Sequence, residues 1–247
     1  MLKFKDANGK LKKMAKKLGI KLKTFTLPAG YTCPGAKDCL AYADRKTGKV
    51  KDGKDTQFRC FMASLEATFP SLRQMVWENL EMIRKALSVD VSKCADLIHE
   101  SLPKKFDVMR VHVGGDYFSE EYLQAWIEVA KRNPSKVFYS YSKSLHFMKK
   151  YALPSNLVLT ASRGGKYDEL IDLHAWKEAV VVYSEKKLPT KGWRSTTTTS
   201  TQRSSLSQSF FLWRRGSSTT WSSACPAWRK RSSATSARCS TVAWRAA

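Results

Sequence analysis

The stretch "FDVMRVHVGGDYFSEEYLQAW", residues 106–126, has the pattern of a strand, a turn and a helix in immediate succession. Its first eight residues form a β-rich run that ends at Gly114, Gly115 and Asp116. Ser119 is a typical N-cap, and the two glutamates that follow it suit the first turn of a helix. The helical spacing then gathers the apolar residues on one face: Tyr122, Leu123, Trp126, Ile127 and Ala130.

The same alternation of strand and helix continues on both sides of this unit. "KTFTL" precedes it as a short strand candidate, and "KVFYSYSKS", "NLVLTASRGG" and "AVVVYSE" follow it. Residues 72–87, 146–151 and 167–176 have helical character. Strands that alternate with helices indicate parallel βαβ units, so the predicted fold class is α/β.

The bulk composition predicts a soluble cytoplasmic protein. The 247 residues suit one ordinary domain or two small ones, and 43% of them are hydrophobic. The basic start of the chain has no apolar run of the signal-peptide kind, and no stretch is apolar enough to cross a bilayer, so no membrane partner is expected. Disulfides are rare in the cytoplasm, where a local group of cysteines is more typical of a metal or redox site.

The chain changes character near Gly192. From Ser195 to the end, 23 of 53 residues are Ser or Thr, and five of the eight tryptophans lie beyond residue 192, yet there is no acid. Disordered tails are usually poor in aromatic residues, so we interpret this segment as an out-of-frame translation, with a genuine basic tail as the alternative. The predicted organisation is a basic arm (1–21), an α/β domain (22–191) and a disordered or mis-framed tail (192–247).

A formal charge of +23 is typical of proteins that bind nucleic acid. Nine of the positive charges lie beyond Gly192, and many of the others lie in "KFKDANGKLKKMAKKLGIKLK" at the start of the chain. This arm could contact phosphates or could be a solvated face, and composition alone leaves both readings open.

The predicted strands all lead into polar or flexible loops. In parallel α/β folds such loops meet at the carboxyl edge of the sheet, where ligands bind. We therefore predict a site there, with ordinary βα turns as the alternative. The candidate cofactor-binding residues are Gly114, Gly115, Asp116, Ser162 and Arg163, and the candidate substrate-binding residues are Lys143, Lys166 and Glu185.

Three cysteines belong to the same prediction. Cys33 and Cys39 flank a Pro-Gly turn after the first strand candidate, and Cys60 follows in "FRCF". Three thiolates suit an iron–sulfur cluster with one open iron, or a zinc site completed by another ligand. The C-x5-C spacing matches no common zinc pattern, so buried or redox cysteines remain an alternative. Cys94 and His112 are expected in the core.

Six blocks of the sequence together resemble the Gene product 88 family of bacteriophage and plasmid-borne proteins. They occur in order between about residues 22 and 186, and the chain departs from the family at the Ser/Thr tail. The resemblance implies no established activity. For a phage-encoded protein it implies the host cytoplasm. The blocks are "LPAGYTCPGAKDC", "DGKDTQFRCF", "VHVGGDYFSEEYLQAW", "FYSYSKSL", "LTASRGGKYDELI" and "AVVVYSE".

A weaker resemblance is to radical S-adenosylmethionine enzymes, which are parallel (β/α) partial barrels. It implies that Cys33, Cys39 and Cys60 bind a [4Fe–4S] cluster and that the Gly-Gly-Asp turn holds S-adenosylmethionine. The usual C-x3-C-x2-C spacing of that superfamily is absent here. Three hypotheses follow: an iron–sulfur enzyme of this type with an unknown substrate, a nucleic-acid-binding protein with a zinc-stabilised cysteine loop, and a hydrolase or transferase that uses Asp116 with Lys143 or Glu185.

Overall fold

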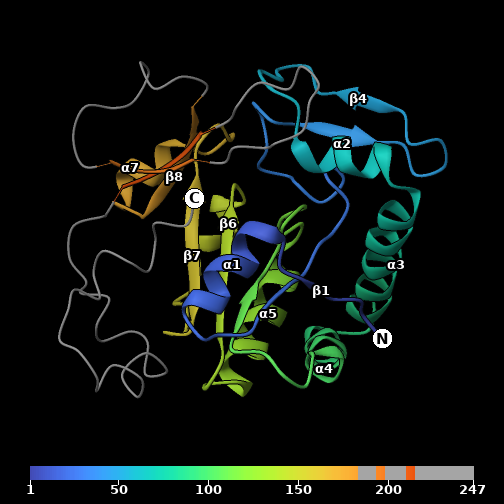
Figure 1. Ribbon diagram of the computed structural model, residues 1–247, viewed down its shortest axis with the longest axis vertical. Coiled ribbons are helices and arrows are strands. Elements are labelled where there is room, and N and C mark those ends of the chain that lie inside the picture. The colour runs from blue at the N-terminus through green and yellow to red at the C-terminus, as the bar shows by residue number, and fades with distance from the viewer. Residues whose placement is uncertain (183–192, 198–209, 215–247) are drawn as a thin grey trace.

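The computed structural model describes residues 1–182, 193–197 and 210–214 (Figure 1). Its main feature is an eight-stranded sheet in the order β1-β2-β5-β6-β7-β8-β10-β9. The strands are β1 (Lys5–Asp6), β2 (Leu22–Thr24), β5 (Val108–Arg110), β6 (Val137–Ser142), β7 (Leu157–Ser162), β8 (Glu178–Val182), β9 (Trp193–Thr197) and β10 (Phe210–Arg214).

Five consecutive strands of this sheet, β2, β5, β6, β7 and β8, are mutually parallel. In the sheet these five strands are neighbours in the same order as in the chain. Because they are parallel, their carboxyl ends and the loops that follow them lie along one edge of the sheet. The predicted α/β class with a mostly parallel sheet is confirmed. Among the described residues the sheet is open, with β1 and β9 at its edges, so the predicted partial barrel stays a prediction.

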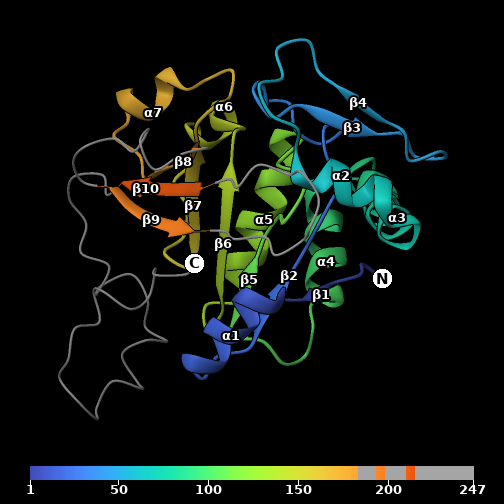
Figure 2. The ribbon, with the colours of Figure 1, turned by 45° about the horizontal axis from the view of Figure 1, so that its top comes forward.

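The helices cover the sheet unequally (Figure 2). The largest apolar core joins strands β5 and β6 to three helices and includes Leu80, Ile98, Met109, Trp126 and Phe138. A second, smaller cluster places α1 against the opposite face, through Ala15 and Tyr139. The helices are α1 (Gly9–Lys17), α2 (Phe61–Thr68), α3 (Pro70–Leu87), α4 (Val91–Ser101), α5 (Glu120–Arg132), α6 (Leu145–Met148) and α7 (Glu169–Leu173).

Helix α5 begins where the sequence predicts. The Ser119 hydroxyl accepts a hydrogen bond from the backbone N–H of Tyr122 at 3.2 Å, which satisfies one of the free donors of the first turn. The apolar face of the helix is buried, and the Trp126 side chain is fully enclosed. The βα unit that begins at β5 therefore forms for the local reasons visible in its sequence.

The first 21 residues pack onto the sheet. Strand β1 pairs with β2 in the antiparallel sense, and the Lys23 ammonium lies 2.5 Å from the Asp6 carboxylate. Leu2 and Ala15 are buried. The basic segment that was expected to form an arm thus contains strand β1 and helix α1, and both pack against the sheet.

Two further features were not predicted. A separate hairpin pairs β3 (Ala41–Ala43) with β4 (Val50–Asp52), between the cysteine loop and α2. Strands β9 and β10 lie in the segment expected to be disordered, and they pair with each other and, through β10, with β8. The expected disorder of this segment stays a prediction. The rest of that segment lies outside the described residues, and the out-of-frame interpretation stays a prediction.

No helix in the described part of the chain is long and apolar enough to cross a bilayer.

Candidate functional site at the carboxyl ends of the parallel strands

The loop that carries Cys33 and Cys39 lies against the loops that follow β6 and β7. Ala36 forms an isolated β-bridge with Gly165, and the backbone N–H of Lys166 donates to the Gly35 carbonyl at 2.9 Å. A Cβ atom at Gly35 would lie 1.9 Å from the Lys143 carbonyl oxygen, so a larger residue there would force the loops apart. These contacts confirm that the strand-end loops meet.

Asp116 joins the end of β5 to the end of β6. One of its carboxylate oxygens accepts hydrogen bonds from the Ser142 hydroxyl at 2.7 Å and the Tyr117 backbone N–H at 2.8 Å. The other accepts from the Lys143 backbone N–H at 2.7 Å. Burial raises the pKa of Asp116, while these hydrogen bonds act in the opposite direction. The carboxylate is thus fully engaged in holding the two strand ends together.

The two glycines before Asp116 serve close packing. A Cβ atom at Gly114 would lie 2.0 Å from the Met62 side chain, and one at Gly115 would lie 2.5 Å from the Thr32 hydroxyl oxygen. Gly115 also has a φ of +80°, which favours glycine. The Gly114 carbonyl accepts the Leu27 N–H at 2.9 Å. The two glycines therefore let α2 and the loop after β2 approach the end of β5 closely. The predicted contact of Gly114 and Gly115 with a cofactor stays a prediction.

Lys143 reaches the loop after β7. Its ammonium donates to the Ser162 hydroxyl at 3.0 Å, to the Ser162 carbonyl at 3.1 Å and to the Arg163 carbonyl. The side chain is largely buried. Burial raises the pKa values of Cys39 and Cys60, and the positive charge of Lys143 acts in the opposite direction. The structure therefore brings Lys143 and Ser162 together beside the cysteines, as the strand-end pattern predicts.

The other predicted residues are arranged differently. The Arg163 guanidinium turns toward α7 and β8, where it pairs with Asp172 at 2.5 Å and with Glu178. These ion pairs hold Arg163 as a link between the two elements. Lys166 has an exposed side chain, and Glu185 lies outside the described residues.

The three cysteines of the predicted metal site lie in one electrostatic environment. All three are free and partly exposed. Burial is the main cause that raises their pKa values, well above the usual range for Cys33 and to about 11 for Cys39. After burial, the charge of Cys60 is a lesser cause that raises the pKa values of both Cys33 and Cys39. Asp116 acts on Cys33 and Cys39 in the same direction.

Thiols with raised pKa values are protonated at neutral pH and are weak nucleophiles. A metal would bind them as thiolates and would release their protons on binding. Among the described residues, no three His, Cys, Asp or Glu side chains form a group that could hold a single metal ion. The sulfurs that bind a cubane cluster are attached to different irons, so they need not converge on one point.

Glu66 on α2 is a buried acid that the sequence did not single out. One carboxylate oxygen accepts the Ala29 N–H at 2.8 Å, and the other has no hydrogen-bond partner. Burial raises the pKa of Glu66 to about 7, and its charge raises the pKa of the Cys60 thiol. Glu66 thus anchors, through Ala29, the segment that leads into the loop with Cys33 and Cys39. A glutamate in the apolar helix "FMASLEAT" was the available signal.

Arg110, the last residue of β5, also escaped the sequence analysis. Its guanidinium lies over the Tyr141 ring, 5.6 Å from the centroid. Tyr141 packs with the α1 cluster, so both side chains lie on the α1 side of the sheet. The Arg110 Nε atom is buried without a hydrogen-bond partner. Cys94 and His112 are buried in the core, as predicted.

Comparison with known proteins identifies the family. A family model described as Gene product 88 matches residues 2–242. The chain belongs to the Gene product 88 family. This match extends beyond residues 22–186, where the six resembling blocks lie. The resemblance to that family is confirmed, whereas the resemblance to radical S-adenosylmethionine enzymes is not shown and stays a prediction.

One curated relative of this Gene product 88 chain is the Gene 88 protein of Mycobacterium phage L5. The two are 29% identical in an alignment of 93 residues that covers 34% of this chain and 38% of the relative. The aligned part is therefore well under two thirds of the phage L5 protein. No solved structure matches the chain significantly.

Proposed function

We propose that this member of the Gene product 88 family is an iron–sulfur enzyme whose cluster is bound by Cys33, Cys39 and Cys60. The observation that carries the proposal is the packing of the cysteine-bearing segments at the strand ends. The loop with Cys33 and Cys39 contacts the loops after β6 and β7, and Met62, two residues after Cys60, lies against Gly114. All three thiols are free. Thiols that stay protonated at neutral pH do not suit nucleophilic catalysis. Binding a cluster would give all three a common role.

The surroundings of the thiols support a cluster. Burial raises the pKa values of Cys39 and Cys60, and the positive charge of Lys143 partly opposes that rise. A positive charge there would offset the negative charge that three thiolates bring to a cluster. Asp116 fixes the backbone of Lys143, and Ser162 fixes its ammonium. We assign these residues to positioning the charge beside the cysteines.

S-adenosylmethionine is the cofactor that the weaker resemblance implies. A cluster held by three cysteines keeps one iron open, and this cofactor would supply radical chemistry there. The groups predicted to hold it already have partners in the protein, because the Asp116 carboxylate and the Gly114 carbonyl bind neighbouring loops. The described residues thus support the cluster more directly than the cofactor.

Anaerobic reconstitution followed by iron and sulfide analysis tests the cluster. We expect about four irons and four sulfides per chain. Cys33→Ser, Cys39→Ser and Cys60→Ser should each lose most of both. Cys94→Ala is the matched control, because Cys94 lies in the apolar core away from this region, and it should keep both. Full iron content in all three serine variants would overturn the proposal.

Zinc is the alternative occupant. Protein purified from medium that contains both metals should take up iron and sulfide rather than zinc. One zinc per chain, lost in the three serine variants and accompanied by no sulfide, would replace the cluster with a structural zinc loop. Equilibrium dialysis with S-adenosylmethionine then tests the cofactor separately: binding should require the cluster and should be absent in Cys33→Ser.

A further inference from the structure

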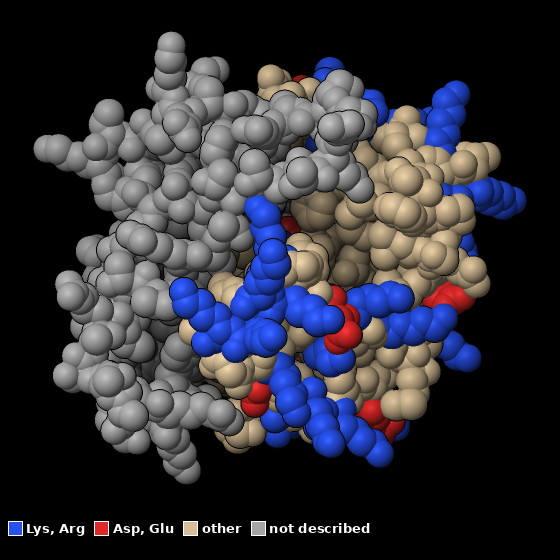
Figure 3. Space-filling model, in the orientation of Figure 1, with Lys and Arg blue, Asp and Glu red and all other residues tan. Residues whose placement is uncertain are grey.

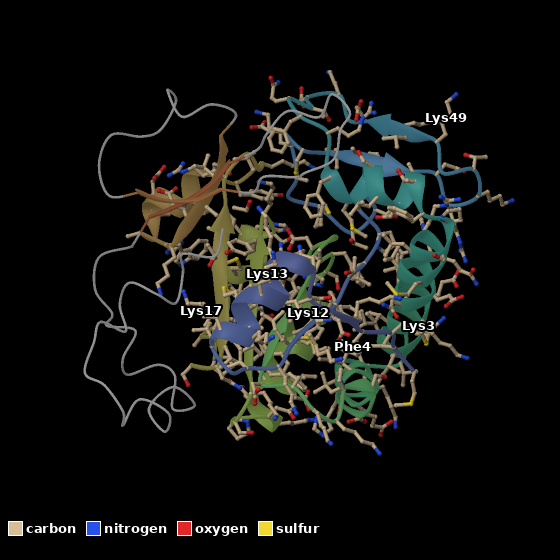
Figure 4. The ribbon with its side chains drawn as sticks, viewed as in Figure 1. Lys3, Phe4, Lys12, Lys13, Lys17 and Lys49 are labelled. Atoms are coloured by element: carbon tan, nitrogen blue, oxygen red, sulfur yellow. The ribbon has the colours of Figure 1, made fainter. Side chains whose placement is uncertain are left out.

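Helix α1 presents a dense array of positive charge. It contains five lysines and no acidic residue within nine positions. Four of these side chains are exposed, and none of those four belongs to an ion pair in the described part of the chain: Lys12, Lys13, Lys16 and Lys17. Figure 3 shows lysine and arginine side chains gathered over this face, and Figure 4 labels Lys12, Lys13 and Lys17 along α1.

The apolar side of α1 is already in use. Ala15 packs against Tyr139, with Leu11, Met14 and Val158 around them. A helix that binds a membrane surface would need to present such residues to the lipid. Because the sheet covers them, α1 can offer an outside partner only its lysines.

Arg110 adds a second, independent observation on the same side of the sheet. Its Nε atom is buried without a partner, and the ion pairs of the described residues do not include its guanidinium. The Arg110 side chain is half-buried over the Tyr141 ring, and a guanidinium in such a place is normally paired with an anion. Arg110 is the last residue of β5, and it lies over Tyr141 on the α1 side of the sheet. An anionic group bound there would satisfy it.

We infer that α1 and Arg110 form a nucleic-acid-binding surface. A nine-residue helix is about 13 Å long, which corresponds to roughly four phosphates of one strand. The lysines would bind successive phosphates, and Arg110 would bind a phosphate nearer the strand ends. An acidic protein is a weaker candidate, because the exposed side of α1 has no aromatic or apolar anchor of the kind that dominates protein interfaces. This inference goes beyond the proposed cluster and does not depend on it.

Two variants with the same loss of charge test this surface. Lys12, Lys13 and Lys17 are changed together to Gln in one, and Lys85, Lys93 and Lys131 in the other. The second set is exposed on α3, α4 and α5, which cover the opposite face of the sheet. Both variants keep the basic residues beyond position 192, so any binding by that segment is common to both.

Fluorescence anisotropy with short single-stranded and duplex DNA and RNA measures affinity across a salt series. We expect the α1 variant to bind at least tenfold more weakly, with a salt slope reduced by about two to three. The control variant should stay within about threefold of wild type. Arg110→Gln, added to the α1 variant, should weaken nucleic-acid binding further at every salt concentration.

Three outcomes would overturn the inference: no binding by wild type at low salt, equal losses in both triple variants, or tighter binding to phosphatidylserine vesicles than to nucleic acid. Measuring Cys33→Ser under the same conditions separates this inference from the proposed function. If Cys33→Ser loses the cluster but still binds nucleic acid, the proposed surface stands without the proposed enzyme. If wild type carries the cluster but binds no nucleic acid, the proposed enzyme stands and the surface is overturned.

Discussion

The two ends of the βα unit at β5 differ in how they bury their side chains. Below the strand ends, Trp126, Phe138 and their neighbours form a largely apolar core. At the strand ends, Asp116, Ser142 and Lys143 are just as inaccessible but are joined by hydrogen bonds. The first region stabilises the fold through apolar burial, whereas the second must satisfy each polar group it encloses.

This difference indicates what each region is for. Apolar packing would have been enough to close the strand ends, yet the chain places a carboxylate, an ammonium and three thiols there. Buried polar groups of this kind cost stability unless every partner is present. Their concentration at one edge of a parallel sheet is typical of a functional site.

The largest expected effect is in the apolar region. Trp126→Ala should lower the free energy of unfolding by about 3–5 kcal/mol, because it leaves a large cavity among well-packed neighbours. Urea denaturation measures the loss. Leu173→Ala, at a residue that is 74% exposed, should change stability by less than about 0.5 kcal/mol and serves as the control. Equal losses in both variants would contradict the assigned core.

Glu66 should make the strand-end region sensitive to pH. Its pKa rises from an ordinary value of 4.5 to about 7 in the folded protein. The neutral acid is therefore favoured by folding. The contribution of neutral Glu66 to the free energy of unfolding is fully present below pH 4.5 and declines as the pH rises through 7. Glu66→Gln should remove this decline and stabilise the protein by up to about 3 kcal/mol at pH 8.

Thermal unfolding of both proteins from pH 4 to pH 8 checks this expectation. The gap between variant and wild type should open as the pH rises. A constant difference across the series would show that Glu66 does not titrate in this range. Glu81→Gln, on an exposed part of α3, is the matched control.

Asp116→Asn should cost about 2 kcal/mol, since an amide nitrogen would face a hydrogen-bond donor where the carboxylate now accepts three bonds. Asp55→Asn, at an exposed position, is the control. Hydrogen exchange at the Lys143 amide should rise in the Asp116 variant well before the core amides are affected. Unchanged protection of that amide would contradict the proposed link between β5 and β6.

The smallest expected effect concerns the start of α5. Ser119→Ala should destabilise the protein by about 1 kcal/mol, because the Tyr122 N–H loses its partner. Ser119→Asp should restore most of this loss, since aspartate also caps helices well. If Ser119→Ala is neutral, the cap contributes nothing measurable to the βα unit.

The βα unit could be predicted because its signals are local. The N-cap at Ser119, the apolar face around Trp126 and the glycine turn all act within a few residues of one another. The meeting of the strand ends also followed, because parallel strands place their carboxyl ends together.

Other features depend on distant contacts that no local pattern reveals. Asp116 finds Ser142 26 residues away, and Glu66 finds Ala29 37 residues away. The lysines of the first segment obscured the apolar stripe of Leu11, Met14 and Ala15, which fixes α1 to the sheet. Arg163 follows β7 as predicted, but its direction is set by Asp172 and Glu178.

The most direct test of the central claim is the electron paramagnetic resonance spectrum of the reconstituted protein after reduction by dithionite. The account predicts the signal of a reduced [4Fe–4S] cluster in wild type and in Cys94→Ala. It predicts the loss or conversion of that signal in Cys33→Ser, Cys39→Ser and Cys60→Ser. An unaltered cluster signal in the three serine variants, or no signal in wild type that has taken up iron and sulfide, would contradict it.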